Sequence, residues 1–193
     1  VSLKQKFVKG DMIVEGERKQ MHAYLIEQFK SLKWIQDVEL PVIGIGGSAR
    51  NIGQVHQQQI NYPISGLHQY EMESEELDNL KKNLIHLSFD ELKQLDGLSS
   101  DRADTIVLAM EVFTSLMDVV DTEQFLISKK GLREGLIINR VQQDDPTAFD
   151  KYNVFEETAR RFAFEYGRSE KELATLYRLA RQMYEEACKL GYF

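Results

Sequence analysis

Cysteine is almost absent from this chain, and so is any long apolar segment. Cys188 is the single cysteine among 193 residues, so no internal disulfide and no thiolate metal cluster can form within the chain. We expect Cys188 to be a half-buried helix residue. No apolar run approaches the roughly 18 residues of a membrane span, and the N-terminal residues do not resemble a signal peptide. These absences predict a soluble, cytoplasmic protein that does not bind membranes.

Positive charge is also scarce. The chain has 24 Lys and Arg against 31 Asp and Glu, which gives a formal net charge of -7. Nonspecific nucleic-acid binding draws on a broad basic surface, so this balance argues against a nucleic-acid partner. A site for a small phosphate-rich anion needs only backbone N–H groups and a few local cations, such as those near Arg50, Arg102 and Lys129–Arg133.

Apolar spacing predicts helices that alternate with a few short strands. Ser88 and Glu91 have the spacing of a capping box, which predicts a short helix after Ser88. Residues 1–14 are expected to contain a strand and an irregular connection. Strands are predicted at 40–45 and 124–128, and longer helices at 17–32, 48–59, 75–87, about 100–120 and 132–140.

A polar stretch from Gln142 to Asp150 interrupts the apolar periodicity and predicts a domain boundary. Residues 1–141 would form an α/β domain, and residues 142–193 a linker with a short helical segment. Two helices are expected in that segment. One covers 154–166, and the other begins at a capping box made by Ser169 and Glu172.

A glycine turn joins the predicted strand at 40–45 to the helix that follows. Gly44 to Ala49 match the pattern G-x-G-x-x-A, in which backbone N–H groups at a helix start approach phosphate closely. A dinucleotide site would also need a second strand ending in an acid about 20 residues on. Glu71 has that spacing, but Pro63 and Gly66 oppose a strand before it. A tight turn that needs glycine only for its backbone angles is the other alternative.

Four motifs in order resemble the exopolyphosphatase and guanosine pentaphosphate phosphohydrolase family. The first is the glycine turn, Ile43–Ile52, with the Tyr62-Pro63-Ile64 segment after it. Gly97–Asp104, Leu126–Ser128 and Gly131–Leu136 follow in the order of the family's later landmarks. The resemblance spans Val1 to Arg140, and it implies the later part of such a protein.

The resemblance implies a fold and a chemistry. The fold would be the second α/β domain of an actin-like, ribonuclease H-like ATPase-type architecture, with phosphate held between two domains. The family removes terminal phosphate from inorganic polyphosphate or guanosine pentaphosphate with a divalent metal, usually Mg²⁺. Polyphosphate or guanosine penta- or tetraphosphate is therefore the expected partner, and a homodimer is possible. The candidate phosphate-binding residues are Gly46, Gly47, Ser48, Arg50, Arg102 and Arg133.

The arginine candidates have structural alternatives. Arg102, expected in the first turn of a helix, could instead form a salt bridge with Asp101 or Asp104. Arg133 could pair with Glu134.

No catalytic residue and no metal ligand is assigned to this chain. In the family, the catalytic glutamate and two glycine-rich phosphate loops would precede Val1, so the chain alone is expected to be inactive. The four histidines show no paired metal-ligand spacing. The alternative to half of a hydrolase is a regulatory module that binds polyphosphate or guanosine tetraphosphate without turnover.

Overall fold

The computed structural model describes residues 2–36, 38, 40–63, 66–145 and 163–191. The chain divides into two compact units, Val1–Gly135 and Leu136–Phe193. The first unit is mixed α/β, as the apolar spacing predicts. The predicted domain boundary after residue 141 stays a prediction.

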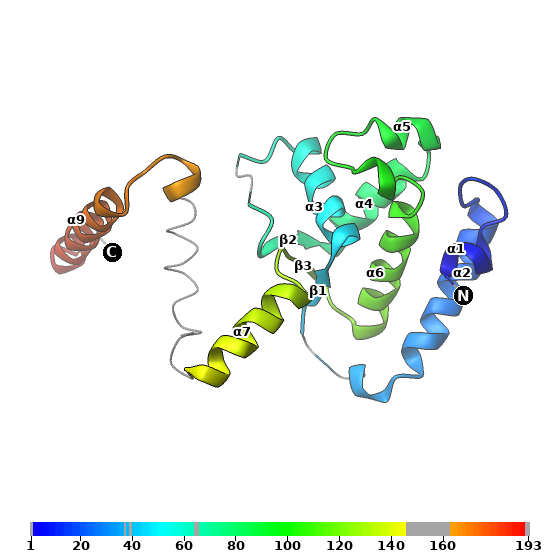
Figure 1. Ribbon diagram of the computed structural model, residues 1–193, viewed down its shortest axis with the longest axis horizontal. Helices are drawn as coiled ribbons and strands as arrows, with labels where there is room; N and C mark the ends of the chain where they lie inside the picture. Colours follow the sequence, from blue (N-terminus) through cyan, green and yellow to red (C-terminus); the bar gives the residue numbers. More distant parts are fainter. Residues whose placement is uncertain (1, 37, 39, 64–65, 146–162, 192–193) are drawn as a thin grey trace. The chain divides into compact units, whose positions relative to one another are not determined.

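A small sheet organises the first unit (Figure 1). It contains β1 (Val42–Ile45), β2 (Tyr70–Glu73) and β3 (Gln124–Ser128), in the order β1-β3-β2. β1 pairs with β3 in parallel, whereas β2 pairs with β3 antiparallel. Because successive side chains of a strand point to opposite faces, one row of Val42, Phe125 and Met72 faces the core together.

Helices cover that inner face of the sheet. They are α3 (Gly47–Gln59), α4 (Ser74–Leu84) and α6 (Ile106–Val120), whose apolar side chains join the strand residues in one buried cluster. α2 (Glu15–Lys30) packs against α6 on the side away from the sheet (Figure 1). A short helix, α5 (Phe89–Lys93), begins at the predicted capping box of Ser88 and Glu91. Ile43 and Ile45 point to the opposite face of the sheet and are exposed.

The N-terminal residues are helical, so the strand expected within residues 1–14 is wrong. Ser2 and Gln5 form a reciprocal capping box that starts α1 (Leu3–Phe7). Leu3 and Phe7 are spaced by one helical turn and pack beside the buried side chains of α2. This local capping, together with a shared apolar side, favours a helix over a strand.

Most of the other predicted elements are confirmed. β3 spans the residues expected of it, and α2, α3, α4 and α6 occupy the predicted helical stretches with shifts at their ends. β2 was not predicted. Its sequence, Tyr-Glu-Met-Glu, alternates buried and exposed side chains as a strand with one covered face should.

Two helices extend into or lie within the second unit. α7 (Leu132–Asp144) is longer than predicted, and α9 (Glu170–Lys189) begins at the predicted capping box of Ser169 and Glu172. Most of the helix predicted for 154–166 lies outside the described residues. Cys188 is on α9, but its side chain is exposed rather than half-buried. None of the helices in the described part of the chain combines the length and the apolar content of a membrane span.

Candidate phosphate site

The candidate site lies where β1 and β3 end. Ile45 is the register partner of Ser128, so the carboxyl ends of these two parallel strands lie next to each other. A turn and a helix follow each strand: α3 follows β1, and α7 follows β3. In open sheets of parallel strands, ligands bind outside the carboxyl ends of the strands. The topology therefore brings the Gly46–Ser48 turn and the Lys129–Arg133 turn to one edge of the sheet.

The first turn of α3 is not capped by a side chain. Gly46 is the N-cap residue, with φ 108° and ψ -172°, a conformation that essentially only glycine adopts. The first N–H groups of a helix have no intrahelical acceptor, and the N-terminal end of the helix dipole is positive. At α3 those groups belong to Gly46, Gly47, Ser48 and Ala49, so the candidate turn presents donors suited to an anion.

Arg102 lies over this turn although it is 55 residues away in the sequence (102 − 47). A Cβ built on Gly47 would lie 3.5 Å from both Nε and Nη2 of Arg102, so the guanidinium group lies beside the face of the turn where a Gly47 side chain would stand. The Arg102 side chain is 44% exposed, which leaves part of the guanidinium group open to a ligand. The structure thus brings together two candidate segments that the sequence could only treat separately.

The secondary structure around Arg102 differs from the prediction. Arg102 ends a 3-10 turn, η2 (Ser100–Arg102), and α6 begins only at Ile106, so Arg102 is not in the first turn of that helix. Of the two predicted salt-bridge partners, Asp101 is at 3.7 Å from Arg102 Nε. Asp104 instead receives a hydrogen bond from Lys4 Nζ at 2.7 Å, and this bond holds the pKa of Asp104 below its usual value.

Arg50 contacts the same turn from within α3. Its Nε donates a hydrogen bond to the Gly46 carbonyl oxygen at 3.2 Å. The side chain therefore folds back along its own helix, where it stabilises the turn and adds positive charge to it.

The turn after β3 is closed by local hydrogen bonds. Ser128 Oγ accepts a bond from Lys130 N at 3.2 Å and donates one to Lys130 O at 2.9 Å. Glu134 Oε2 accepts a bond from Gly131 N at 2.8 Å, and this bond lowers the pKa of Glu134. Arg133 is exposed in the first turn of α7. Glu134 thus caps α7, and its hydrogen bond is with the Gly131 backbone.

Asn51 also belongs to this site, although it is not among the residues predicted from the sequence. It is 6% exposed, and its amide bonds in two directions. Nδ2 donates to the Gly47 carbonyl oxygen at 2.9 Å, and Oδ1 accepts from Ser99 N at 2.6 Å. An asparagine one turn after a glycine turn is the only sequence signal for it, and that signal is weak.

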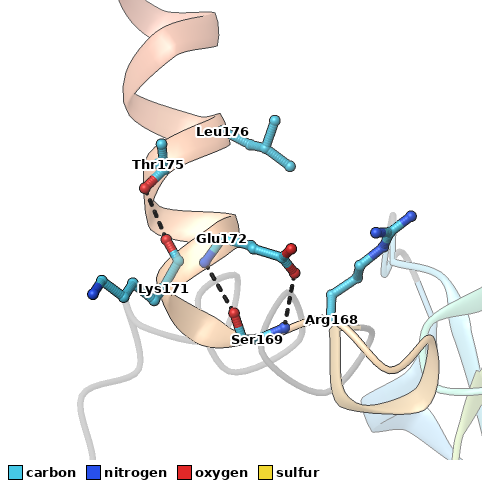
Figure 2. Close-up of a pocket in the computed structure, with 6 residues that line it drawn as sticks. All are labelled: Arg168, Ser169, Lys171, Glu172, Thr175 and Leu176. Atoms are coloured by element: carbon cyan, nitrogen blue, oxygen red, sulfur yellow. Dashed lines mark hydrogen bonds between the residues drawn. The ribbon is translucent and has the colours of Figure 1, made fainter.

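A hollow lies at the start of α9 (Figure 2). It is lined by Arg168, Ser169, Lys171, Glu172, Thr175 and Leu176. Here the Ser169 hydroxyl accepts a hydrogen bond from Glu172 N at 3.2 Å, and the Glu172 carboxylate accepts one from Ser169 N at 3.3 Å. Side chains at the start of α9 therefore accept hydrogen bonds from N-terminal N–H groups of this helix, whereas no side chain caps α3. We assign no site to this hollow.

No metal site is built from the described residues, since no group of three or more His, Cys, Asp and Glu side chains among them could hold an ion. Two of the histidines have other partners in the fold. His22 Nδ1 is 3.0 Å from Glu111 Oε1, and His56 Nδ1 is 2.8 Å from Tyr70 Oη. We therefore derive no step through a metal ion from this chain.

Comparisons with solved structures show the same architecture elsewhere. A Ppx/GppA family member from Aquifex aeolicus matches with a TM-score of 0.65 and 18% identity, covering 74% of this chain and 46% of that one. An exopolyphosphatase from Cytophaga hutchinsonii matches with a TM-score of 0.64 and 22% identity, covering 73% and 46%. This chain therefore spans less than half the length of these proteins. No curated protein sequence gives a significant match.

These matches show the fold. The solved structures have an actin-like fold, and this chain corresponds to a C-terminal part of it, as predicted. The model of the Ppx/GppA phosphatase family matches residues 1–144, which is more than half of the chain. The chain therefore belongs to the Ppx/GppA phosphatase family.

Proposed function

We propose that this chain provides one side of the phosphate site of a hydrolase that releases terminal phosphate from inorganic polyphosphate or guanosine pentaphosphate. The observation behind the proposal is the position of Arg102 over the uncapped start of α3. An arginine fork beside free backbone donors suits the oxygens of a phosphate chain. The family match and the exopolyphosphatase neighbour support the same class of substrate.

The charge of the chain is compatible with this proposal. A net charge of -7 disfavours a broad anion-binding surface, so the attraction must be local. Gly46–Ala49, Arg50, Arg102 and the turn before α7 concentrate donors and cations at one edge of the sheet. A short, highly charged phosphate chain would contact such a cluster at several oxygens.

The reaction we propose is phosphoanhydride hydrolysis. A water activated by a carboxylate attacks the terminal phosphorus, and the bond to the bridging oxygen breaks. Arg102 and the α3 donors would hold the phosphate oxygens and stabilise negative charge on the transferred group. We propose that the activating glutamate comes from sequence outside this chain. We also propose that a longer protein uses Mg²⁺, which would neutralise charge on the phosphates.

A regulatory module is the alternative. The same donors and cations could bind polyphosphate or guanosine tetraphosphate without turnover. Both alternatives predict binding at Arg102, and only the hydrolase predicts phosphate release by a longer protein that contains this chain. The homodimer and the cytoplasmic location stay predictions.

Binding can be measured on this chain alone. We expect Arg102→Ala to weaken tripolyphosphate binding by about 1 to 3 kcal/mol in calorimetry, the scale of a lost charged hydrogen bond. Lys30→Ala is the matched control, because Lys30 is an exposed cation on α2 and its removal changes the net charge equally. Equal affinities of Arg102→Ala and the unaltered chain would refute a direct role of Arg102 in binding.

A further inference from the structure

Asn51 connects the two segments that form the candidate site. Its side chain is buried, and it uses both ends of its amide. One end donates to Gly47 O, in the turn that offers the phosphate donors, and the other accepts from Ser99 N, directly before the turn that contains Arg102. An amide that bonds at both ends fixes the distance between the groups it joins.

The segment before Arg102, Gly97–Ser99, also packs closely against α3. Gly97 has φ +86°, and a Cβ there would lie 2.8 Å from the Gln54 carbonyl carbon and 2.9 Å from Val55 N. Only a residue without a side chain allows this approach of the two backbones. Leu98 then inserts into the core, where it is 8% exposed. The segment therefore lies against α3 at Gly97 and is bonded to it through Asn51 at Ser99, while Leu98 lies in the core.

The short turn between Ser99 and Arg102 fixes the Arg102 backbone relative to Ser99. Arg102 N donates to Ser99 O at 2.8 Å, which closes η2. The Ser99 peptide is thus fixed on one side by Asn51 and on the other by the turn that ends at Arg102. A continuous path of hydrogen bonds runs from Gly47 through Asn51 and Ser99 to Arg102, whose guanidinium group returns to Gly47.

We infer that Asn51 is a positioning residue that holds Arg102 over the start of α3 for phosphate binding. This inference rests on the proposed function, because it assumes that Arg102 and the α3 donors bind the same anion. Asn51 itself needs no contact with the ligand, since its amide is occupied by Gly47 and Ser99. Its contribution to binding should therefore disappear when the Arg102 side chain is removed.

The test is a double-mutant cycle in tripolyphosphate binding, measured by calorimetry on the 193-residue chain. We expect Asn51→Ala to weaken the affinity about three- to tenfold when Arg102 is present. In the Arg102→Ala background, the same substitution should change the affinity by less than about twofold.

Gln57→Ala is the matched control for lost stability. Gln57 is a second buried amide on α3, 8% exposed, and its Nε2 donates to Gly66 O at 3.0 Å, more than two turns after Gly47. Its removal should lower the thermal unfolding midpoint as Asn51→Ala does, while the affinity for tripolyphosphate stays unchanged. A loss of affinity in Gln57→Ala equal to that in Asn51→Ala would show a general effect of destabilisation and overturn the inference.

Ser99→Pro removes the other side of the same bond and covers the case in which Asn51→Ala does not fold. Ser99 has φ -69°, which proline adopts, and the substitution deletes the N–H that Asn51 accepts. We expect a similar loss of affinity. If Arg102→Ala weakens binding but neither Asn51→Ala nor Ser99→Pro does, the inference is wrong and the proposed function stands. If Arg102→Ala has no effect, the proposed function itself fails.

Discussion

At the scale of single residues, Gly97 shows how much a close backbone approach depends on one missing side chain. Its φ of +86° and its contact with the Gln54 and Val55 backbone leave no space for a Cβ. The neighbouring atoms belong to the backbone of α3 rather than to a flexible side chain, so they cannot move aside locally. The position of the Arg102 segment therefore depends on glycine at this residue.

We expect Gly97→Ala to lower the free energy of unfolding by about 2 to 4 kcal/mol, from left-handed strain and overpacking combined. Urea denaturation followed by circular dichroism measures this change. Gly16→Ala is the control, because Gly16 is helical and a Cβ there meets nothing within 4 Å. That substitution should stabilise the chain by about 0.5 to 1 kcal/mol. A Gly97→Ala chain as stable as the unaltered one would contradict the close contact between this segment and the backbone of α3.

His56 is a second residue whose surroundings predict a measurable effect. The residue is 6% exposed, and its Nδ1 is 2.8 Å from Tyr70 Oη. Burial lowers the pKa of His56, although the nearby Glu76 carboxylate opposes this effect. Burial also raises the pKa of Tyr70 to about 12, so the phenol stays protonated at neutral pH. His56 is therefore held neutral in the folded chain.

Acid should destabilise the chain through His56. Below the unfolded pKa of about 6.5, the unfolded chain binds a proton at this histidine while the folded chain does not, so stability falls with pH until the folded pKa is passed. We expect the free energy of unfolding to fall as the pH drops below about 7.5, and to fall less in His56→Gln. His86→Gln, at an exposed histidine, should keep the full pH dependence. Identical pH dependence in both variants would contradict this account.

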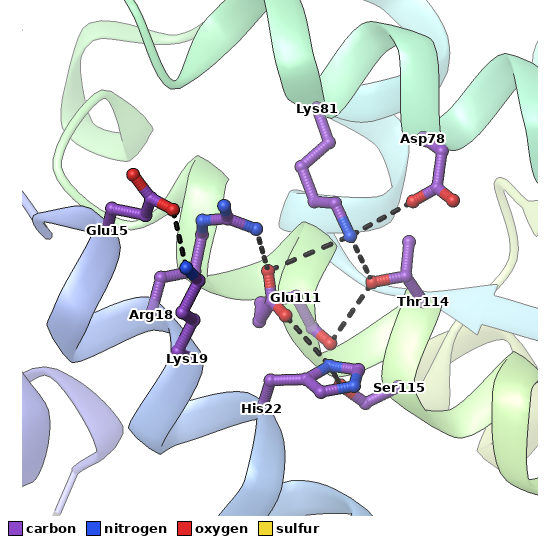
Figure 3. Close-up of polar contacts among 9 residues, drawn as sticks. All are labelled: Glu15, Arg18, Lys19, His22, Asp78, Lys81, Glu111, Thr114 and Ser115. Carbon is purple, nitrogen blue, oxygen red and sulfur yellow. Dashed lines mark hydrogen bonds and ion pairs between the residues drawn. The ribbon is translucent and has the colours of Figure 1, made fainter.

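At the scale of elements, a buried group of charges joins three helices (Figure 3). Glu111 of α6 is 2% exposed, and its Oε1 is 3.0 Å from His22 Nδ1 of α2. Its Oε2 is 3.7 Å from Lys81 Nζ of α4 and 3.8 Å from Arg18 Nη1 of α2. Lys81 also donates to Thr114 Oγ1 at 2.8 Å. One carboxylate thus balances cations from two neighbouring helices.

Glu111→Gln should cost about 2 to 4 kcal/mol of unfolding free energy, because it removes a negative charge that compensates the buried Lys81 and the partly buried Arg18. Urea denaturation again gives the value. Lys19→Ala is the control: the Lys19–Glu15 pair lies on exposed α2 surface, with side chains 73% and 70% exposed, and its loss should have no measurable effect. Equal stabilities of Glu111→Gln and Lys19→Ala would show that the buried group does not stabilise the helix packing.

The elements that the sequence predicted correctly have strong local signals. The capping boxes at Ser88 and Ser169 start helices where expected, since the two side chains that satisfy the first N–H groups are close in sequence. β2 was missed because four residues of alternation are a short signal, and its pairing with β3 joins residues 51 to 57 positions apart in the chain. Arg102 was predicted in the first turn of α6 because the apolar spacing of this helix continues on the N-terminal side of Ile106, where the helix begins.

At the scale of the whole molecule, the sequence predicted the segments of the candidate site but not their assembly. Gly47 and Arg102 belong to separate sequence motifs, and their proximity depends on how the Gly97 segment lies on α3. The proximity of the turns after β1 and β3 follows from parallel pairing, which no local pattern specifies. Asn51 was missed for the same reason, because its second partner is 48 residues away.

We propose that this chain is one side of a phosphohydrolase site and that phosphate release needs residues from elsewhere in a longer protein. The most direct measurement is phosphate release from polyphosphate with Mg²⁺, by this chain and by a longer protein that contains it. We predict release by the longer protein and none by this chain, and loss of release in the longer protein carrying Arg102→Ala. Phosphate release by the 193-residue chain alone, or none by a longer protein that binds polyphosphate, would contradict the claim.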